Sequence, residues 1–352
     1  MLRRIYILIF CLALATILVT GCATSPGTGS LTTWVEATPT TQAVAPTLPV
    51  PPTAAAPEIT LAALATSPAS QVELPEPTPS ETPNLPATVA PPQPVRFAVI
   101  GDFGSGDHNE GDVADLVKSW NPDFIVTVGD NNYPDGAADT IDDRVGQFYQ
   151  EYIAPYQGQY GPGADQPRFF PVLGNHDWNT AKGQAYLDYF SLPGNERYYD
   201  FTWGPVHFFM LSSDSREPDG VGSKSVQAQW LQERLTASQL PWKLVMMHHS
   251  AYSSGTHGSV DWMRWPFQEW GADAVLAGHD HTYERLSIDG LPYFVNGLGG
   301  GAIYAFLDKL DGSQVRYNDD YGAMLVTASE QNMVFEFFNR SGELIDQFEL
   351  QK

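Results

Sequence analysis

Five short apolar runs in this chain of 352 residues each end directly in a polar cluster, and this arrangement limits the possible folds more than any other feature. The runs are rich in β-branched and aromatic residues and have the length of buried strands. With the clusters that end them they read, in chain order, VIGDFG, VTVGDNNY, PVLGNHDW, LVMMHHS and VLAGHDH. In layered α/β folds, ligands gather beyond the carboxyl ends of the strands. We therefore expect the five clusters to converge on one site.

Two further apolar runs, VHFFMLSS and LPYFVNG, also predict strands. Segments with helical character separate the runs, which predicts an α/β fold built from layers of sheet and helix. The predicted helices cover residues 112–120, 140–152, 180–190, 225–240 and 261–270. Near the end of the chain, YGAMLVTA, NMVFEFFN and ELIDQFEL indicate consecutive strands with turns between them. We expect these last strands to pair antiparallel and to close one sheet.

The N-terminus has the layout of a secretory signal peptide. Arg3 and Arg4 precede an apolar run over residues 5–19, which is short for a membrane-spanning helix. The small residues before Cys22 resemble a bacterial lipobox, which predicts a lipoprotein signal peptide over residues 1–21 and lipidation of Cys22. The protein would then be secreted and anchored by lipid to the outer face of a bacterial membrane. The alternative is an ordinary signal peptide with an accidental cysteine.

The two segments that follow differ sharply in composition. Residues 22–95 are rich in Thr, Pro and Ala and cannot bury enough apolar surface to fold, so we predict a disordered tether. Residues 96–352 are long enough for one sizeable domain. Without the two Arg and five Glu that precede it, this domain has 16 basic and 36 acidic residues and a formal charge of −20. That charge argues against nucleic acid as a partner, and a phosphate substrate would need positive charge supplied locally.

From the polar clusters we select seven side chains as candidate metal ligands, and none of them is a thiol. They are Asp102, Asp130, Tyr133, Asn175, His248, His279 and His281. Such a set of oxygen and nitrogen ligands suits iron, zinc or manganese. Seven ligands are too many for one catalytic metal but fit two metals that clamp a phosphoryl group. Each cluster taken alone could instead be a turn.

In order and in type, these motifs resemble the calcineurin-like metallophosphoesterases, and within them the small tartrate-resistant purple acid phosphatases. The resemblance runs from residue 96 to about residue 306. It implies a metallophosphoesterase domain with two mixed β-sheets flanked by helices. It also implies the metal ligands: Asp102, Tyr133 and His281 for the first metal, Asn175, His248 and His279 for the second, with Asp130 bridging both.

One departure from the general family pattern concerns the first motif. Most calcineurin-like enzymes have Asp-x-His there, whereas this chain has Gly104 in place of the histidine. The purple enzymes supply the missing ligand from the position of Tyr133. Because a phenolate favours iron(III), the resemblance implies Fe(III) paired with Fe(II), Zn(II) or Mn(II).

The remaining histidines fall into two groups. His176 and His257 are candidates for phosphate contact and general acid catalysis, although His257 could be a flexible loop residue. His249 adjoins His248 and should point to the opposite face of its strand. We expect His207 to be a packed strand residue and His108 to lie in a solvated loop.

Together these features predict an extracytoplasmic two-metal phosphatase that hydrolyses small phosphate monoesters by in-line attack of a metal-bound hydroxide. A phosphodiesterase or nucleotide hydrolase is the first alternative, because substrate choice depends on loops such as 135–143 and 157–166. A non-catalytic phosphate-binding module at the cell surface is the second.

Overall fold

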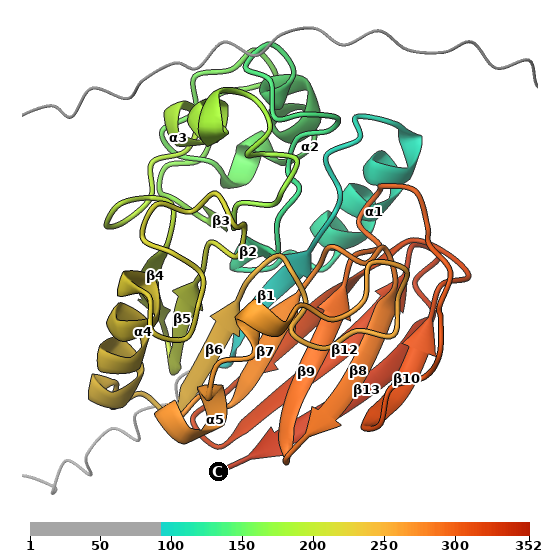
Figure 1. Cartoon of the computed structure of the whole chain (residues 1–352). Helices are drawn as coiled ribbons and strands as arrows, with labels where there is room; N and C mark the ends of the chain where they lie inside the picture. The colour runs from blue at the N-terminus through green and yellow to red at the C-terminus, as the bar shows by residue number, and fades with distance from the viewer. Residues whose placement is uncertain (1–92) are drawn as a thin grey trace, which may run out of the picture. The chain divides into compact units, whose positions relative to one another are not determined.

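The computed structural model describes residues 93–352 (Figure 1). The predicted signal peptide, the lipidation residue Cys22 and most of the predicted tether lie outside the described residues. The first strand, β1 (Val95–Ile100), begins one residue before the predicted domain boundary, with Val95 paired to Ala328. Among residues 93–352, no helix is both long enough and apolar enough to cross a membrane.

The described residues form two mixed β-sheets, which confirms the predicted fold class. The six-stranded sheet has the order β13-β12-β11-β1-β2-β3. Its other strands are β2 (Phe124–Thr127), β3 (Phe169–Phe170), β11 (Gly322–Ala328), β12 (Asn332–Asn339) and β13 (Leu344–Gln351). The last three pair antiparallel, as predicted.

The seven-stranded sheet has the order β10-β8-β9-β7-β6-β5-β4. Its strands are β4 (Tyr199–Trp203), β5 (Val206–Met210), β6 (Trp242–Met246), β7 (Ala274–Ala277), β8 (Tyr283–Ile288), β9 (Leu291–Asn296) and β10 (Ser313–Tyr317). Strands β5, β6, β7 and β9 run parallel to one another.

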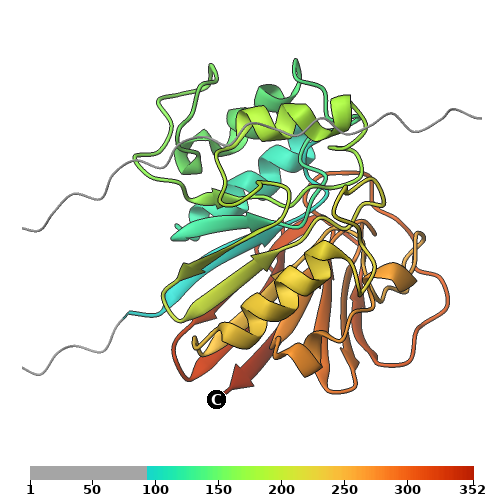
Figure 2. The same cartoon turned by 60° about the vertical axis from the view of Figure 1, so that its left-hand side comes forward.

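Within residues 93–352, α-helices cover the outer faces of the sheets. They are α1 (His108–Ser119), α2 (Gln147–Tyr149), α3 (Gln184–Tyr189), α4 (Val226–Ala237) and α5 (Phe267–Trp270). Helices α1 to α3 pack on the six-stranded sheet, and α4 and α5 pack on the seven-stranded sheet (Figure 2). The result is a sandwich of two sheets between two layers of helices.

The alternation of side chains in β1 shows why its sequence is apolar throughout. Phe97 and Val99 face the core between the two sheets, whereas Ala98 and Ile100 face the layer that contains α1. All four are fully buried. A strand with two buried faces needs an unbroken apolar run rather than an alternating one.

The start of α1 differs from the prediction. The helix begins at residue 108 rather than 112, because the Asp107 carboxylate caps it and accepts hydrogen bonds from the backbone N–H groups of Asn109 and Glu110. His108 is therefore the exposed first residue of a helix and not a loop residue.

Candidate metal centre

The structure brings all seven predicted metal-binding side chains into one cluster at the carboxyl ends of five strands. Asp102 follows β1, Asp130 and Tyr133 follow β2, Asn175 follows β3, His248 follows β6, and His279 and His281 follow β7. Strands β1 to β3 belong to one sheet, and β6 and β7 belong to the other. The site therefore lies where the ends of the two sheets meet.

One group of donors surrounds the Tyr133 hydroxyl. This oxygen lies 3.0 Å from His281 Nε2, 3.1 Å from Asp130 Oδ2 and 3.5 Å from Asp102 Oδ1. His281 Nε2 also lies 3.4 Å from Asp102 Oδ1. A phenol has a single proton and can satisfy only one of these three neighbours, so the group has more lone pairs than protons. A cation bound here would accept the lone pairs for which no proton is available.

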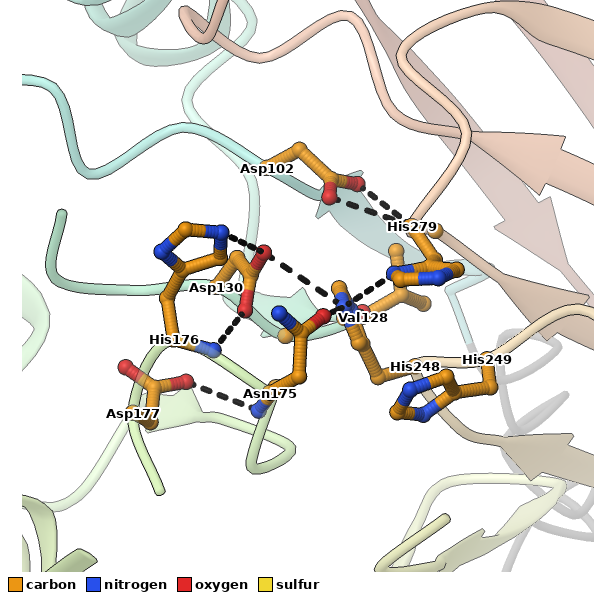
Figure 3. Close-up of polar contacts among 12 residues, drawn as sticks. Asp102, Val128, Asp130, Asn175, His176, Asp177, His248, His249 and His279 are labelled. Carbon is orange, nitrogen blue, oxygen red and sulfur yellow. Dashed lines mark hydrogen bonds and ion pairs between the residues drawn. The ribbon is translucent and has the colours of Figure 1, made fainter. Parts of the chain in front are cut away.

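A second group surrounds His248 Nε2. It lies 2.9 Å from Asn175 Oδ1, 3.2 Å from His279 Nδ1 and 3.4 Å from Asp130 Oδ2. The same oxygen of Asp130 thus takes part in both groups, and in Figure 3 its carboxylate lies between His176 and His248. Asp102, Asp130 and His248 are all buried, and their ligand atoms lie within 4.8 Å of one another.

Backbone carbonyls fix the orientation of two imidazoles. His281 Nδ1 lies 2.5 Å from the carbonyl oxygen of Ala302, and His248 Nδ1 lies 2.9 Å from that of Val128. A ring nitrogen that donates its hydrogen to a carbonyl leaves the other nitrogen, Nε2, free to bind a metal. In both residues this free nitrogen faces the cluster.

The electrostatics of the cluster also favour a cation. Burial, followed by the charges of Asp130 and Asp102, raises the pKa of the Tyr133 phenol well above its usual value. Burial lowers the pKa of His248, but Asp130 and Asp102 outweigh it and raise this pKa overall. For His279, burial and then the neighbouring His248 lower the pKa. At neutral pH the phenol therefore stays protonated unless positive charge is added beside it. The residues present therefore fit bound metal ions.

Three of these residues have strained backbone. Asp102, Asp130 and His279 have φ angles of 54°, 54° and 71°. Left-handed conformations of this kind cost residues other than glycine about 1–3 kcal/mol each and persist only where the surroundings enforce them. The N–H of His279 donates to both carboxylate oxygens of Asp102 at 3.0–3.1 Å, which is one such restraint.

Packing explains why glycine replaces histidine in the first motif. A Cβ atom at Gly104 would lie 1.9 Å from the carbonyl oxygen of Asn131, so no side chain fits there. The Gly104 carbonyl instead accepts a hydrogen bond from the N–H of Tyr133 at 2.8 Å. The loop that excludes a ligand at position 104 is thus the loop that presents Tyr133.

The two predicted catalytic histidines each lie close to a member of the cluster. The backbone N–H of His176 donates to Asp130 Oδ1 at 2.9 Å, and its ring Nε2 lies 4.0 Å from Asp130 Oδ2. The ring of His257 lies 4.3 Å from the ring of His279, nearly parallel to it, and its side chain is exposed.

The two other histidines contribute no atom to the donor groups, although the ring of His249 packs 4.4 Å from that of His279. Nδ1 of the buried His249 lies 3.0 Å from the Ser213 hydroxyl, and burial together with His248 lowers its pKa to about 3. His207 is packed in β5, with its ring nitrogens 2.7 Å from Asp200 and 2.9 Å from Ser238.

Two residues that hold the site were not identified from the sequence. The Asp177 carboxylate accepts hydrogen bonds from the N–H of Gly174 at 2.8 Å and from the side chain of Asn131 at 2.8 Å. Arg216 donates to the Asn175 carbonyl at 2.8 Å and is itself held by Asp214. Asp177 could have been noticed inside GNHDW, whereas nothing near Arg216 in the sequence indicates its partner.

A cavity of about 390 Å³ opens beside the first donor group. Its walls combine aromatic, polar and backbone groups: Ser105, Asp107, Tyr133, His176, His281, Gly300, Gly301, Ala302, Tyr304 and Tyr321. The ring of Tyr304 stacks on that of His281 at 4.1 Å. An organic group attached to a phosphate at the cluster would have room here.

Comparison with known proteins gives a consistent result. The family model for calcineurin-like phosphoesterases matches residues 95–283. Tartrate-resistant acid phosphatase type 5 of Mus musculus is 25% identical over 248 residues, which cover 60% of this chain and 74% of that protein. Purple acid phosphatase 7 of Arabidopsis thaliana is 24% identical over 291 residues, covering 73% and 86% respectively.

The fold of a solved purple acid phosphatase is also similar. The structure of PPD1 from yellow lupin (Lupinus luteus) seeds superposes with a TM-score of 0.58 at 20% identity. The match covers 75% of this chain but only 55% of the lupin protein.

Proposed function

The chain belongs to the calcineurin-like phosphoesterase family and is a metal-dependent phosphoesterase of the purple acid phosphatase type; within that class, we propose that it hydrolyses phosphate monoesters at a two-metal centre. One observation carries the proposal. Asp130 Oδ2 lies 3.1 Å from Tyr133 and 3.4 Å from His248, so one carboxylate oxygen reaches both donor groups. A bridging ligand needs this position.

The proposed assignment follows the two donor groups. Asp102, Tyr133 and His281 would hold one metal, Asn175, His248 and His279 the other, and Asp130 would bridge them. Fe(III) with Fe(II), Zn(II) or Mn(II) is the proposed pair, which would neutralise phosphoryl charge and lower the pKa of water near the phosphorus. The buried phenol of Tyr133 supports iron(III) as one member, because its raised pKa has to be overcome by a strong Lewis acid.

His176 and His257 are proposed to contact the substrate and to hold the proton that the departing alkoxide needs. They contact different members of the cluster, His176 lying near Asp130 and His257 on the ring of His279. A positioned imidazole in such a role contributes about 10²–10⁴-fold to the rate.

Monoesters are proposed over diesters because the named relatives are acid phosphatases. The cavity beside Tyr304 offers room for one organic group. The low cationic content of the domain is compatible with this choice, because the positive charge for one phosphate would come from the centre itself.

The proposed place of action is outside the cytoplasm, with the protein held to a membrane by lipid at Cys22. The basic start, the short apolar run and the small residues before Cys22 support this part of the proposal.

The test combines metal analysis of the purified protein with assays on phenyl phosphate and on diphenyl phosphate. We expect about two metal ions per chain, one of them iron, and kcat/KM at least about tenfold higher for the monoester, a difference of about 1.4 kcal/mol in transition-state stabilisation. Faster hydrolysis of the diester would contradict the proposed monoester preference and indicate a phosphodiesterase. If the metal-loaded protein cleaves neither ester, the remaining alternative is a non-catalytic phosphate-binding module.

A further inference from the structure

We propose that two buried carboxylates, Asp280 and Glu284, are positioning residues that hold His257 over the metal centre; the inference rests on the proposed function. Both side chains are completely buried, and neither is among the predicted metal ligands. Buried carboxylates are costly unless hydrogen bonds satisfy them. In both cases, the satisfying donors come from residues 253–258, which we call the His257 loop.

Asp280 binds the part of the loop that contains His257 itself. Its Oδ1 accepts a hydrogen bond from the N–H of His257 at 2.7 Å. Its Oδ2 accepts from the N–H of Gly258 at 3.0 Å and from the hydroxyl of Ser253 at 2.5 Å. The loop also packs tightly here, since a Cβ atom at Gly255 would lie 2.3 Å from Asp280 Cγ. One carboxylate therefore fixes both ends of the loop.

Glu284 binds the middle of the loop. Its Oε2 accepts from the N–H of Ser254 at 2.7 Å, and its Oε1 accepts from the Ser254 hydroxyl at 2.6 Å. The same hydroxyl accepts from the N–H of Leu310 at 3.0 Å, and the Ser254 carbonyl accepts from the N–H of Leu307 at 2.8 Å. Glu284 thus joins the His257 loop to the segment that follows Tyr304.

The residue that these contacts place is itself exposed. One face of the His257 ring lies 4.3 Å from the His279 ring, at an interplanar angle of 25°, and Tyr304 lies 5.3 Å away. The residue as a whole is exposed to solvent. An exposed imidazole on a loop would normally sample many positions, yet the loop beneath this one is held by five hydrogen bonds to buried carboxylates.

The two carboxylates are also close in the sequence to two of the predicted metal ligands. Asp280 stands between His279 and His281, and Glu284 follows three residues after His281. One short segment therefore carries two donors of the cluster and both carboxylates that hold the loop. His257 is fixed relative to the centre and not merely to the rest of the fold.

The first experiment measures hydrogen exchange and needs no activity. In the full protein, the amides of Ser254, His257 and Gly258 should be protected, and Glu284→Ala should speed exchange across residues 253–258 by at least about tenfold. The matched control is Asp346→Ala, which removes a buried carboxylate that binds Tyr283 and Arg285 and has no contact with the loop. A loop that exchanges freely in the wild type, or equally fast in wild type and Glu284→Ala, overturns the inference.

The second experiment is a double-mutant cycle on kcat for phenyl phosphate. Glu284→Ala should lower kcat about 10- to 100-fold, the usual effect of a small displacement of a catalytic group. Glu284→Gln keeps an acceptor for the N–H of Ser254 and should recover most of the loss. In a His257→Ala background, Glu284→Ala should change kcat by less than about twofold, because the group it positions is gone.

The outcomes separate this inference from the proposed function. Independent, multiplicative losses from Glu284→Ala and His257→Ala would show that Glu284 acts on the fold alone, while the phosphatase assignment stands. If Asp346→Ala lowers kcat as much as Glu284→Ala does, the positioning role is likewise refuted. A wild type without phosphatase activity would refute the proposed function, and hydrogen exchange would then decide whether the carboxylates hold the loop.

Discussion

Asp130 contributes one oxygen to both donor groups, so the proposed centre depends on its charge more than on that of any single terminal ligand. Asp130→Asn keeps the shape but removes the charge. We expect hydrolysis to fall by at least about 10³-fold, since the loss of about 4 kcal/mol of transition-state stabilisation has this effect. The measurement is kcat/KM with metal content and thermal unfolding recorded in parallel.

The matched control for that variant is Asp115→Asn, because the Asp115 carboxylate lies on α1 and is 83% exposed. It should retain wild-type turnover. Asp130→Asn at near-wild-type turnover would contradict the two-metal assignment.

The proposal that one of the two metals is iron(III) depends on Tyr133. A phenolate bound to iron(III) absorbs visible light, so oxidised, iron-loaded protein should be coloured. Tyr133→Phe removes only the hydroxyl oxygen and should bleach this colour and weaken one metal site. Activity should survive in part, because Asp130 and the second donor group remain. Absorption spectra with iron titration check this.

Tyr160→Phe serves as the control for the colour, since the Tyr160 side chain is exposed and its hydroxyl donates to Asp143, away from the donor groups. A Tyr133→Phe variant that keeps its colour would make Tyr133 a packed turn residue.

The predicted metal ligands could be selected from the sequence, because each is of a suitable chemical type and comes within about six residues of a strand end, and the structure gathers them into one cluster. Of the residues that hold the site, only Asp177, which lies inside the third motif, gave a signal in the sequence. Arg216 reaches the carbonyl of Asn175, 41 positions away, and Glu284 reaches Ser254, 30 positions away. Only the folded chain brings such partners together, and Arg and Glu are common enough in any sequence to give no signal of their own.

At the scale of elements, β4, β5 and α4 are joined by one carboxylate. Asp200 in β4 accepts from His207 Nε2 in β5 at 2.7 Å and from Arg234 in α4 at 2.6 Å. Burial alone would raise the pKa of Asp200, but the hydrogen bonds from His207 and Arg234 outweigh it and lower this pKa overall.

The sign of the pH effect follows from that direction. A carboxyl with a lower pKa in the folded state stabilises the fold above its unfolded pKa of about 3.9 and loses this contribution as pH falls through the folded value. Asp200→Asn should therefore lower the free energy of unfolding by roughly 1 kcal/mol at about pH 7. At about pH 2, the variant and the wild type should have the same free energy of unfolding. Urea unfolding across this pH range measures it.

Asp261→Asn is the control, because the Asp261 side chain is 86% exposed. Its unfolding curve should follow the wild type at every pH. If Asp200→Asn does the same, the three elements are held by packing alone.

The elements themselves were predicted where burial was strongest. Strands such as β1 and β6, with buried faces and long apolar runs, were found from the sequence. The missed strands are β4, β8 and β10; β4 and β10 are edge strands with half-exposed residues, and all three contain polar residues that weaken the apolar pattern.

For the molecule as a whole, the sequence predicts a protein tethered at one end. The proposed lipid at Cys22, outside the described residues, is the only anchor that the prediction requires. Cys22→Ser should release the protein from the membrane fraction, since acyl chains rather than a spanning helix are proposed to hold it. Fractionation with immunodetection measures this, and Cys11→Ser, inside the apolar run, is the control. A Cys22→Ser variant that is cleaved yet stays in the membrane fraction contradicts the lipoprotein assignment.

The placement of the donors at the meeting point of two sheets has a consequence for folding kinetics. Tyr133 and His281 lie 148 positions apart in the chain, and the cluster cannot exist until both sheets have formed and docked. Because loop-closure entropy has to be lost before contacts of such long range form, we expect the cluster to assemble late, after the transition state for folding. Bound metal should therefore slow unfolding steeply while leaving the refolding rate almost unchanged. Chelation would then shorten the lifetime of the native state without hindering its formation.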